Sequence, residues 1–475
     1  MAKLPGSNVV QRLGQRRTKG IAGQASAEKT SKSKKVKPTQ KEKARRIIVI
    51  CVFIVYWLLI FEGALRKWVL PNAQEWLFFV RDPFVLAVYF LAIKNDMWPK
   101  WSPVFKVGVG LALIAIPLMM VQIVASNLHI LTGIYGWRMY FWYLPLAFII
   151  GEQFRGKDMQ RLVRHSLIVC VPIALLVLAQ FRSSADSFVN SSLGGSQAML
   201  VSQGVVRTSG TFTVAAAQSL FIGSVMAFLL TAWLLPGKQR PFSLVTLLIA
   251  SGAVMTTFAV SGSRTVFLQL AMIVVGAIAG AFIIFRKRPQ VKMLVILPSL
   301  LVAGALAYLT VFSRAYEVMR ERQLGAMGAE GSIFTRFFNL FTTVLKVVPS
   351  ASILGMGIGS GTMGGTRLAT GTAVFAMAED EWSRIILECG LFGAFYIAYR
   401  AWFLAWLVKN AWRAVERSMN PLPLILVCFI GITFLTGPIS LQGTINGYGW
   451  LFAGFCIAAN RLGIYGRNKE DGVWS

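Results

Sequence analysis

The sequence is poor in charged residues, which make up 14% of its 475 residues, against 56% hydrophobic residues. A water-soluble domain usually carries about 25% charged residues. Acidic residues are the scarcest, with 19 Asp and Glu against 48 Lys and Arg, for a formal net charge of +29. Long apolar runs fill nearly everything after residue 46. This composition excludes a soluble enzyme and predicts a polytopic membrane protein.

The sequence also has few cysteines. All five fall in or at the edge of apolar segments, and no two form a CxxC pair. Zinc sites and disulfide scaffolds require closely spaced or paired cysteines, so we predict neither. We expect the five thiols to be small core residues, and we expect no metal site and no cofactor.

Positive charge is concentrated in residues 1–46, which hold 14 of the 48 Lys and Arg against only Glu28 and Glu42. This segment has too little apolar surface to offset the entropy that it would lose on ordering. We therefore expect a disordered cytoplasmic tail that binds anionic lipids. No nucleic-acid-binding module follows it, so nucleic acid is not an expected partner.

The apolar segments predict about 12 transmembrane helices, on the rule that a span takes about 20 residues. We expect an all-α fold with helices 1–9 in residues 47–312, a large extracytoplasmic loop at 313–384, helices 10–12 in 385–461 and a cytoplasmic tail at 462–475. The predicted spans are 47–65, 76–93, 104–126, 135–151, 166–181, 214–235, 242–260, 265–285, 293–312, 385–407, 421–437 and 444–461.

Lys and Arg collect in the segments that this topology places in the cytoplasm, as is typical of membrane proteins. Those segments hold 33 of the 48 cations, the outer segments hold 14, and Arg400 lies within a span. An even number of spans then places both termini in the cytoplasm.

Twelve of the 14 outer cations are arginines, although Lys and Arg serve topology equally well. The guanidinium group binds phosphate oxygens in pairs and keeps its charge when partly desolvated. We therefore predict a phosphorylated substrate at the outer face. The alternative is ion pairing, as predicted for Glu62 with Arg66 at i,i+4 spacing, or with Asp82, Glu317 and Glu321. The outer cations are Arg66, Lys67, Arg81, Arg138, Arg182, Arg207, Arg264, Arg314, Arg320, Arg322, Arg336, Lys346, Arg367 and Arg384.

The predicted loop at 313–384 is much longer than the other connections, and loops of that length are usually functional or disordered. Residues 333–346 have the amphipathic pattern of a helix that lies on the bilayer. The glycine-rich segment Gly355–Gly361 follows, where backbone can approach a ligand closely. No strand–helix unit surrounds it, so we do not predict a nucleotide site.

Four segments, in this order, resemble motifs of the O-antigen ligase and O-antigen polymerase superfamily of bacterial polysaccharide proteins. Residues 207–212 are similar to its R-x-x-G-T-F motif, and Ser261–Arg264 to its S-G-S-R motif. Arg336 with Gly355–Gly361 resembles its arginine-bearing loop helix and glycine turn. Residues 379–393 are similar to its H-N-x-x-L-x-x-x-x-E-x-G-x-x-G stretch.

The chain departs from the ligases of this family at Glu379, where they carry a histidine. Its two histidines, His129 and His165, lie elsewhere. This difference favours the polymerase branch, with a divergent ligase that uses Glu379, Asp380 or Glu381 as the alternative.

The resemblance implies transfer of a glycan, with inversion, from a polyprenyl diphosphate to an acceptor hydroxyl. We expect this transfer to need no metal, because arginines already supply positive charge and the sequence has no second acidic motif. The expected setting is the outer face of the bacterial cytoplasmic (inner) membrane. We expect polymerisation of exopolysaccharide or O-antigen repeat units; the alternatives are ligase-type transfer of a finished glycan and a twelve-helix solute transporter. A flippase and a chain-length regulator are the protein partners that the resemblance implies.

The diphosphate leaving group gains negative charge, which fixed cations in a partly dry site stabilise. We therefore expect Arg264 and Arg336 to be catalytic. Together with Arg207, and with Gly357 and Gly359 nearby, they are expected to bind the diphosphate.

Three consecutive acids, Glu379, Asp380 and Glu381, precede the tenth predicted helix, where crowding and desolvation raise the pKa of carboxyl groups. We predict Glu379 or Glu381 as the catalytic base for the acceptor hydroxyl. The alternatives are a Mg²⁺ site and plain solvated acids.

Overall fold

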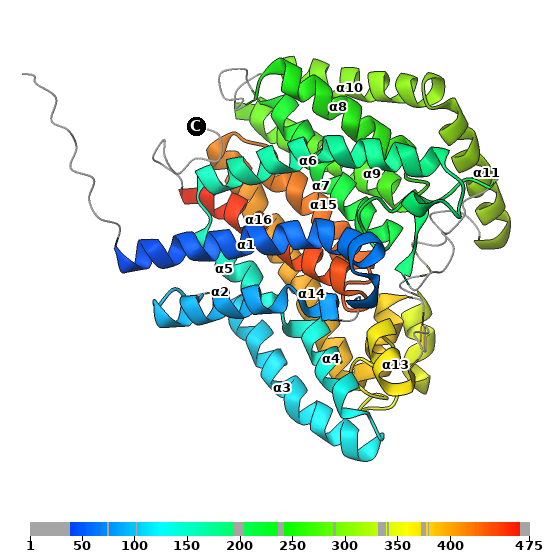
Figure 1. Cartoon of the computed structure of the whole chain (residues 1–475). Coiled ribbons are helices and arrows are strands. Elements are labelled where there is room, and N and C mark those ends of the chain that lie inside the picture. The colour runs from blue at the N-terminus through cyan, green and yellow to red at the C-terminus, as the bar shows by residue number, and fades with distance from the viewer. Residues whose placement is uncertain are drawn as a thin grey trace, which may run out of the picture. The chain divides into compact units, whose positions relative to one another are not determined.

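The regular elements of the described residues are helices (Figure 1), which confirms the predicted all-α class. The computed structural model describes residues 39–73, 76–100, 102–193, 204–235, 242–287, 291–330, 339, 342–371, 377–378 and 380–465. The helices are α1 (Gln40–Ala64), α2 (Asp82–Lys94), α3 (Pro103–Ala125), α4 (Ile130–Phe141), α5 (Leu144–Gln153), α6 (Gly156–Arg182), α7 (Ala215–Leu234), α8 (Leu244–Ala259), α9 (Arg264–Lys287), α10 (Val291–Thr310), α11 (Ser313–Glu330), α13 (Met363–Thr370), α14 (Glu381–Ser418), α15 (Leu422–Thr436) and α16 (Gly443–Tyr465). The described residues from Ala44 onward belong to one compact unit.

Eight helices in the described part of the chain are long and apolar enough to cross a membrane. They cover Gln40–Val69, Trp76–Lys94, Pro103–Ala125, Gly156–Arg182, Ala215–Leu234, Arg264–Lys287, Met293–Thr310 and Glu381–Ser418. Two further apolar helices, α8 and α15, are shorter, at 16 and 15 residues. The count of twelve spans stays a prediction.

Several helix boundaries differ from the predicted ones for local reasons. The first helix begins at Gln40, so the last residues of the predicted tail are helical. The single span predicted at 135–151 is two helices, α4 and α5, separated at Trp142 and Tyr143. Pro145 lies in the first turn of α5, and its missing N–H prevents the hydrogen bonds of α4 from continuing.

The tenth predicted span belongs to the 38-residue helix α14, which has one non-helical residue, Gly390 (φ 56°, ψ −133°). A side chain at Gly390 would overlap the backbone carbonyl of Ile353. The N–H of Leu391 donates to that carbonyl at 3.0 Å. Glycine therefore permits the loop before α14 to pack against the helix at its kink.

The predicted loop at 313–384 contains regular structure in its described parts. Helices α11 and α13 lie within it, and residues 342–347 are helical. Most of the predicted amphipathic helix at 333–346 lies outside the described residues.

The last three helices lie at the centre of the unit formed by residues 44–475. Helix α16 packs against α5, α14 and α15, and α15 packs against α7 and α9. In Figure 1, these orange and red helices run between the green helices α7–α10 and the cyan helices α3 and α4. The five cysteines are unpaired thiols, four of them buried, as predicted for core residues. This packing brings the start of α16 and the end of α15 beside α7 and α9.

Candidate functional site

Three arginines, Arg207, Arg264 and Arg322, which we call the arginine cluster, meet at the turn between α8 and α9. Arg264 is the first residue of α9. Nη2 of Arg207 donates to Oγ of Ser263 at 3.4 Å, and Nη1 of Arg322 donates to the carbonyl oxygen of Gly262. Burial lowers the pKa of Arg207, and together with the positive charges of Arg322 and Arg264 it brings this pKa to about 10. Arg207 is therefore charged at neutral pH, and an anion at the turn is attracted by several guanidinium groups at once.

The turn that presents the cluster is fixed by the first three residues of the S-G-S-R motif. Gly262 has a φ of 57°, in the left-handed region that glycine favours. Oγ of Ser261 donates to a carbonyl one turn earlier in α8 at 2.9 Å, and Oγ of Ser263 accepts from Oγ of Ser219 in α7 at 3.0 Å. Both motif serines are buried, whereas Arg264 is half-buried. The two serines of the motif therefore pack in the interior, and its arginine is partly accessible at the surface.

The segment that carries Arg207 is clamped by two polar side chains from other helices. Nζ of Lys67, in the turn after α1, donates to the carbonyl oxygens of Gly210 and Phe212, each at 2.8 Å. Oε1 of Gln180, in α6, accepts from the N–H of Gly210 at 2.8 Å. The sequence did not predict either residue as part of the site. The one signal for Lys67 is its place among the outer cations.

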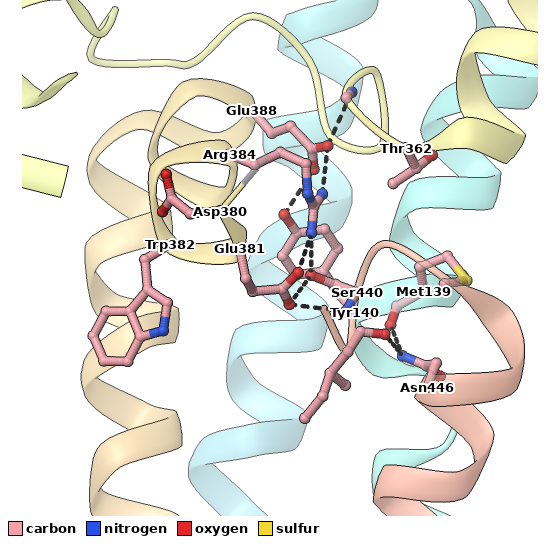
Figure 2. Close-up of polar contacts among 12 residues, drawn as sticks. Met139, Tyr140, Thr362, Asp380, Glu381, Trp382, Arg384, Glu388, Ser440 and Asn446 are labelled. Atoms are coloured by element: carbon pink, nitrogen blue, oxygen red, sulfur yellow. Dashed lines mark hydrogen bonds and ion pairs between the residues drawn. The ribbon is translucent and has the colours of Figure 1, made fainter. Parts of the chain in front are cut away.

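A second group of charged side chains lies at the start of α14, and we call it the carboxylate network: Glu381, Arg384, Glu388, Arg400 and Ser440. Nη2 of Arg384 lies 2.7 Å from Oε2 of Glu381, and Nη1 lies 2.6 Å from Oε1 of Glu388 (Figure 2). Oε1 of Glu381 also accepts from Nη1 of Arg400 at 3.0 Å and from the N–H and Oγ of Ser440 at 2.8 and 2.7 Å. All five side chains are buried. Two acids and two arginines therefore neutralise each other in the core, as buried charges require.

The network gives both carboxylate oxygens of Glu381 partners within the protein, and its role as a base stays a prediction. Its oxygens accept from three residues, whereas a base needs a lone pair directed at the acceptor hydroxyl. Asp380 caps α14, because its Oδ1 accepts from the N–H of Ser383 at 2.8 Å. Glu379 and Arg336 lie outside the described residues. Within the described residues, no three His, Cys, Asp or Glu side chains gather as metal ligands would.

The glycine-rich segment approaches other parts of the protein closely. Oε2 and Oε1 of Glu388 accept from the N–H groups of Gly359 and Gly361 at 3.1 and 2.9 Å. A side chain at Gly359 would overlap Gly136 of α4, and the N–H of Gly357 donates to the backbone carbonyl of Glu388 at 3.0 Å. The close approach is made to α4 and α14, and binding of a ligand by these glycines stays a prediction.

The predicted ion pair near the amino end is confirmed. Nη1 of Arg66 lies 3.2 Å from Oε1 of Glu62, and Nε of Arg81 lies 2.9 Å from Oε2 of the same carboxylate. Arg138 makes two hydrogen bonds of 2.8 Å to Asp82. Ion pairing therefore accounts for Arg66, Arg81 and Arg138, as the alternative to phosphate binding predicts.

No known protein family, curated protein or solved structure matches this chain. A function must therefore be argued from the geometry and from the motifs. The structure brings Arg207 and Arg264 to one turn, as predicted for a shared site, and adds Arg322. In the structure, Glu381, Gly357 and Gly359 make contacts with other parts of the protein.

Proposed function

We propose that the protein polymerises polysaccharide repeat units from polyprenyl-diphosphate-linked donors at the outer face of the bacterial cytoplasmic membrane. The arginine cluster carries the proposal: burial and the charges of Arg322 and Arg264 together lower the pKa of Arg207. Guanidinium groups bind phosphate oxygens in pairs. A cluster of them at the end of a membrane-length helix suits a diphosphate whose lipid chain lies in the bilayer.

In the proposed reaction, the acceptor hydroxyl oxygen attacks the anomeric carbon, and the bond between that carbon and the diphosphate oxygen breaks. The electron pair leaves with the diphosphate, and the arginine cluster stabilises its added charge. The hydroxyl proton passes to a base. Asp380 and Glu381 have other partners, so Glu379 is our candidate for this base.

We further propose a setting of twelve spans with both termini in the cytoplasm and residues 1–46 against anionic lipids. The arginines supply the positive charge that a metal ion supplies in other transferases, so the proposed transfer is metal-independent. A flippase would deliver the lipid-linked donor, and a chain-length regulator would control the product.

Deletion of the gene followed by size analysis of surface and lipid-linked glycans tests this proposal. The deletion strain receives the wild-type gene, Arg264→Ala, or Arg286→Ala as a matched control. Arg286 is exposed in the last turn of the same helix α9. We expect wild type and Arg286→Ala to restore long chains, and Arg264→Ala to leave single repeat units.

The other outcomes are equally informative. Long chains that accumulate on the lipid carrier would identify ligase-type transfer to a separate acceptor. Glycans that are unchanged by the deletion would contradict both transfer reactions and favour the transporter.

A further inference from the structure

Residues 347–366, in the predicted outer loop, contain no charged side chain. About a quarter of the residues in water-soluble domains are charged. Three apolar side chains of this stretch are also exposed: Ile353 is 78% exposed, Met356 is 54% exposed and Leu354 is 41% exposed. Apolar side chains that gather on a surface indicate contact with a partner or a membrane. This part of the loop therefore needs an apolar neighbour.

Helix α3 indicates how deep this stretch lies in the membrane. Nε2 of Gln122, in α3, donates to the carbonyl oxygen of Leu354 at 2.6 Å, and Oε1 accepts from the N–H of Ile358 at 2.8 Å. Gln122 lies 16 residues beyond the exposed Lys106 at the start of α3. That is about 24 Å along a helix, less than the hydrocarbon thickness of about 30 Å. A helix that enters the hydrocarbon at Lys106 therefore reaches the loop before it leaves the hydrocarbon.

Helix α14 gives the same depth independently. The N–H of Leu391 donates to the carbonyl oxygen of Ile353 at 3.0 Å, and the N–H of Met356 donates to that of Leu387 at 2.8 Å. Leu391 lies 18 residues before the exposed Lys409 of the same helix. This separation is about 27 Å, again less than the hydrocarbon thickness. Because the predicted topology places Lys106 and Lys409 on the cytoplasmic side, both helices place this part of the loop in the outer half of the membrane.

The backbone of this stretch is paired, although residues 351–362 are irregular. The N–H groups of all eight residues from Gly355 to Thr362 donate within the protein. Their acceptors are carbonyls of the loop and of α14 and the side chains of Gln122 and Glu388. Unpaired backbone groups are costly in hydrocarbon, so irregular backbone occurs at membrane depth only where the protein or enclosed water pairs it. The stretch meets this requirement.

We propose that residues 352–358 form a re-entrant segment in the outer leaflet of the membrane, where Ile353, Leu354 and Met356 contact lipid acyl chains. The chain would enter and leave at the outer face, since the charged residues that flank the stretch, Lys346 and Arg367, are both predicted there. The proposal goes beyond the expected extracytoplasmic loop. It depends on α3 and α14 crossing the membrane and not on the proposed reaction.

The exposed surface around the segment favours lipid over a protein partner. Leu391 and Phe395 of α14 are each 59% exposed, and Val124 of α3 is 83% exposed. Most of α3 and of α14 is likewise outside the core, although both are long and apolar enough to cross a membrane. The apolar side chains of the segment therefore continue the surface that these helices present to the bilayer.

The test places a nitroxide spin label on Ile353→Cys and on Met356→Cys in the full-length protein, in vesicles of phosphatidylethanolamine and phosphatidylglycerol. Collision rates are measured with oxygen, which concentrates in hydrocarbon, and with a neutral nickel chelate, which stays in water. Phe395→Cys in α14 is the lipid control. Ser184→Cys, exposed in the turn after α6, is the aqueous control. Unsubstituted protein treated with the label gives the background of the native thiols, four of which are buried.

We expect labels at 353 and 356 to behave like the label at 395. Their ratio of oxygen to nickel collisions should exceed that at 184 by about tenfold or more, because hydrocarbon excludes a polar solute. Both side chains are exposed, so their replacement should leave the fold intact, and each site checks the other.

Three results would overturn the proposal. Labels at 353 and 356 that collide mainly with the nickel chelate would show that the segment lies in water. Labels shielded from both reagents would show that protein covers it, such as a second copy of the chain. A nickel-accessible label at 395 would show that α14 does not cross the membrane as the depth argument requires.

Discussion

The arginine cluster and the carboxylate network use the same side chain in opposite ways. In the network, Arg384 and Arg400 are almost fully buried, and carboxylate oxygens lie 2.6 to 3.0 Å from their nitrogens. In the cluster, Arg207 is half-buried, and the nearby charges of Arg322 and Arg264 are like its own. Alternating charges stabilise a fold, whereas gathered like charges attract an anion. The comparison separates arginines that hold the protein together from arginines for which we propose a ligand.

The largest effect is expected from Arg384→Ala, which leaves Glu381 and Glu388 buried without their shared counter-ion. Removing one partner of a buried pair costs about 3–5 kcal/mol. We expect the purified variant to unfold at a much lower temperature or not to accumulate in the membrane. Arg413→Ala, at an exposed position of the same helix, is the control and should unfold as wild type. If Arg384→Ala unfolds at the wild-type temperature, the claim that the carboxylate network stabilises the fold is wrong.

Arg264→Lys should give the converse result, a loss of activity at unchanged stability. Lysine keeps the charge but cannot bind two phosphate oxygens in a planar fork. We expect polymer formation to fall about 100-fold, the scale seen when one preorganised charge-stabilising donor is lost. Arg286→Lys, at the other end of α9, is the control. If Arg264→Lys makes normal amounts of polymer, bidentate phosphate binding at this position is wrong.

Lys67→Met should weaken the site indirectly, through the segment that carries Arg207. The substitution removes the Lys67 hydrogen bonds to the carbonyls of Gly210 and Phe212, although Nε2 of Gln180 still donates to the Gly210 carbonyl at 3.3 Å. We expect about tenfold weaker binding of a polyprenyl diphosphate. Lys94→Met, at an exposed cation of α2, should have no effect.

A double variant shows whether Lys67 acts through Arg207. In an Arg207→Ala background, Lys67→Met should cause no further loss of affinity, because coupled residues are not additive. If the losses of affinity caused by Lys67→Met and Arg207→Ala add up in the double variant, Lys67 supports the fold in general and does not position Arg207.

The smallest effect is the response of the two regions to salt. Half-buried charges are partly screened at 1 M salt, where the Debye length is about 3 Å, and fully buried pairs are screened much less. Raising the ionic strength should therefore weaken binding of the lipid diphosphate and leave the unfolding temperature nearly constant. Binding that is insensitive to salt would indicate recognition of the lipid chain instead of the diphosphate.

The sequence predicts the fold class because long apolar runs admit few structures other than membrane-length helices. It also places Arg207 and Arg264 correctly near one another, since their motifs fall at the same predicted membrane face. Pro145 indicates the break between α4 and α5, but a count of apolar residues takes no account of proline.

The roles of Glu381 and the glycines depend on contacts distant in sequence. Ser440 follows Glu381 by 59 residues, and Arg400 lies inside the predicted tenth span, so no local pattern identifies them as its partners. Glycine at position 359 indicates a close approach, but only the structure shows that the approach is to Gly136.

The most direct test of the arginine cluster is a binding titration of the purified full chain with a polyprenyl diphosphate and with the corresponding polyprenol, which lacks phosphate. We predict that the diphosphate binds more tightly by about tenfold or more, the scale of a charge-assisted contact, and that Arg264→Ala abolishes the preference while Arg286→Ala retains it. Equal affinity of the wild-type protein for the two lipids would contradict the account.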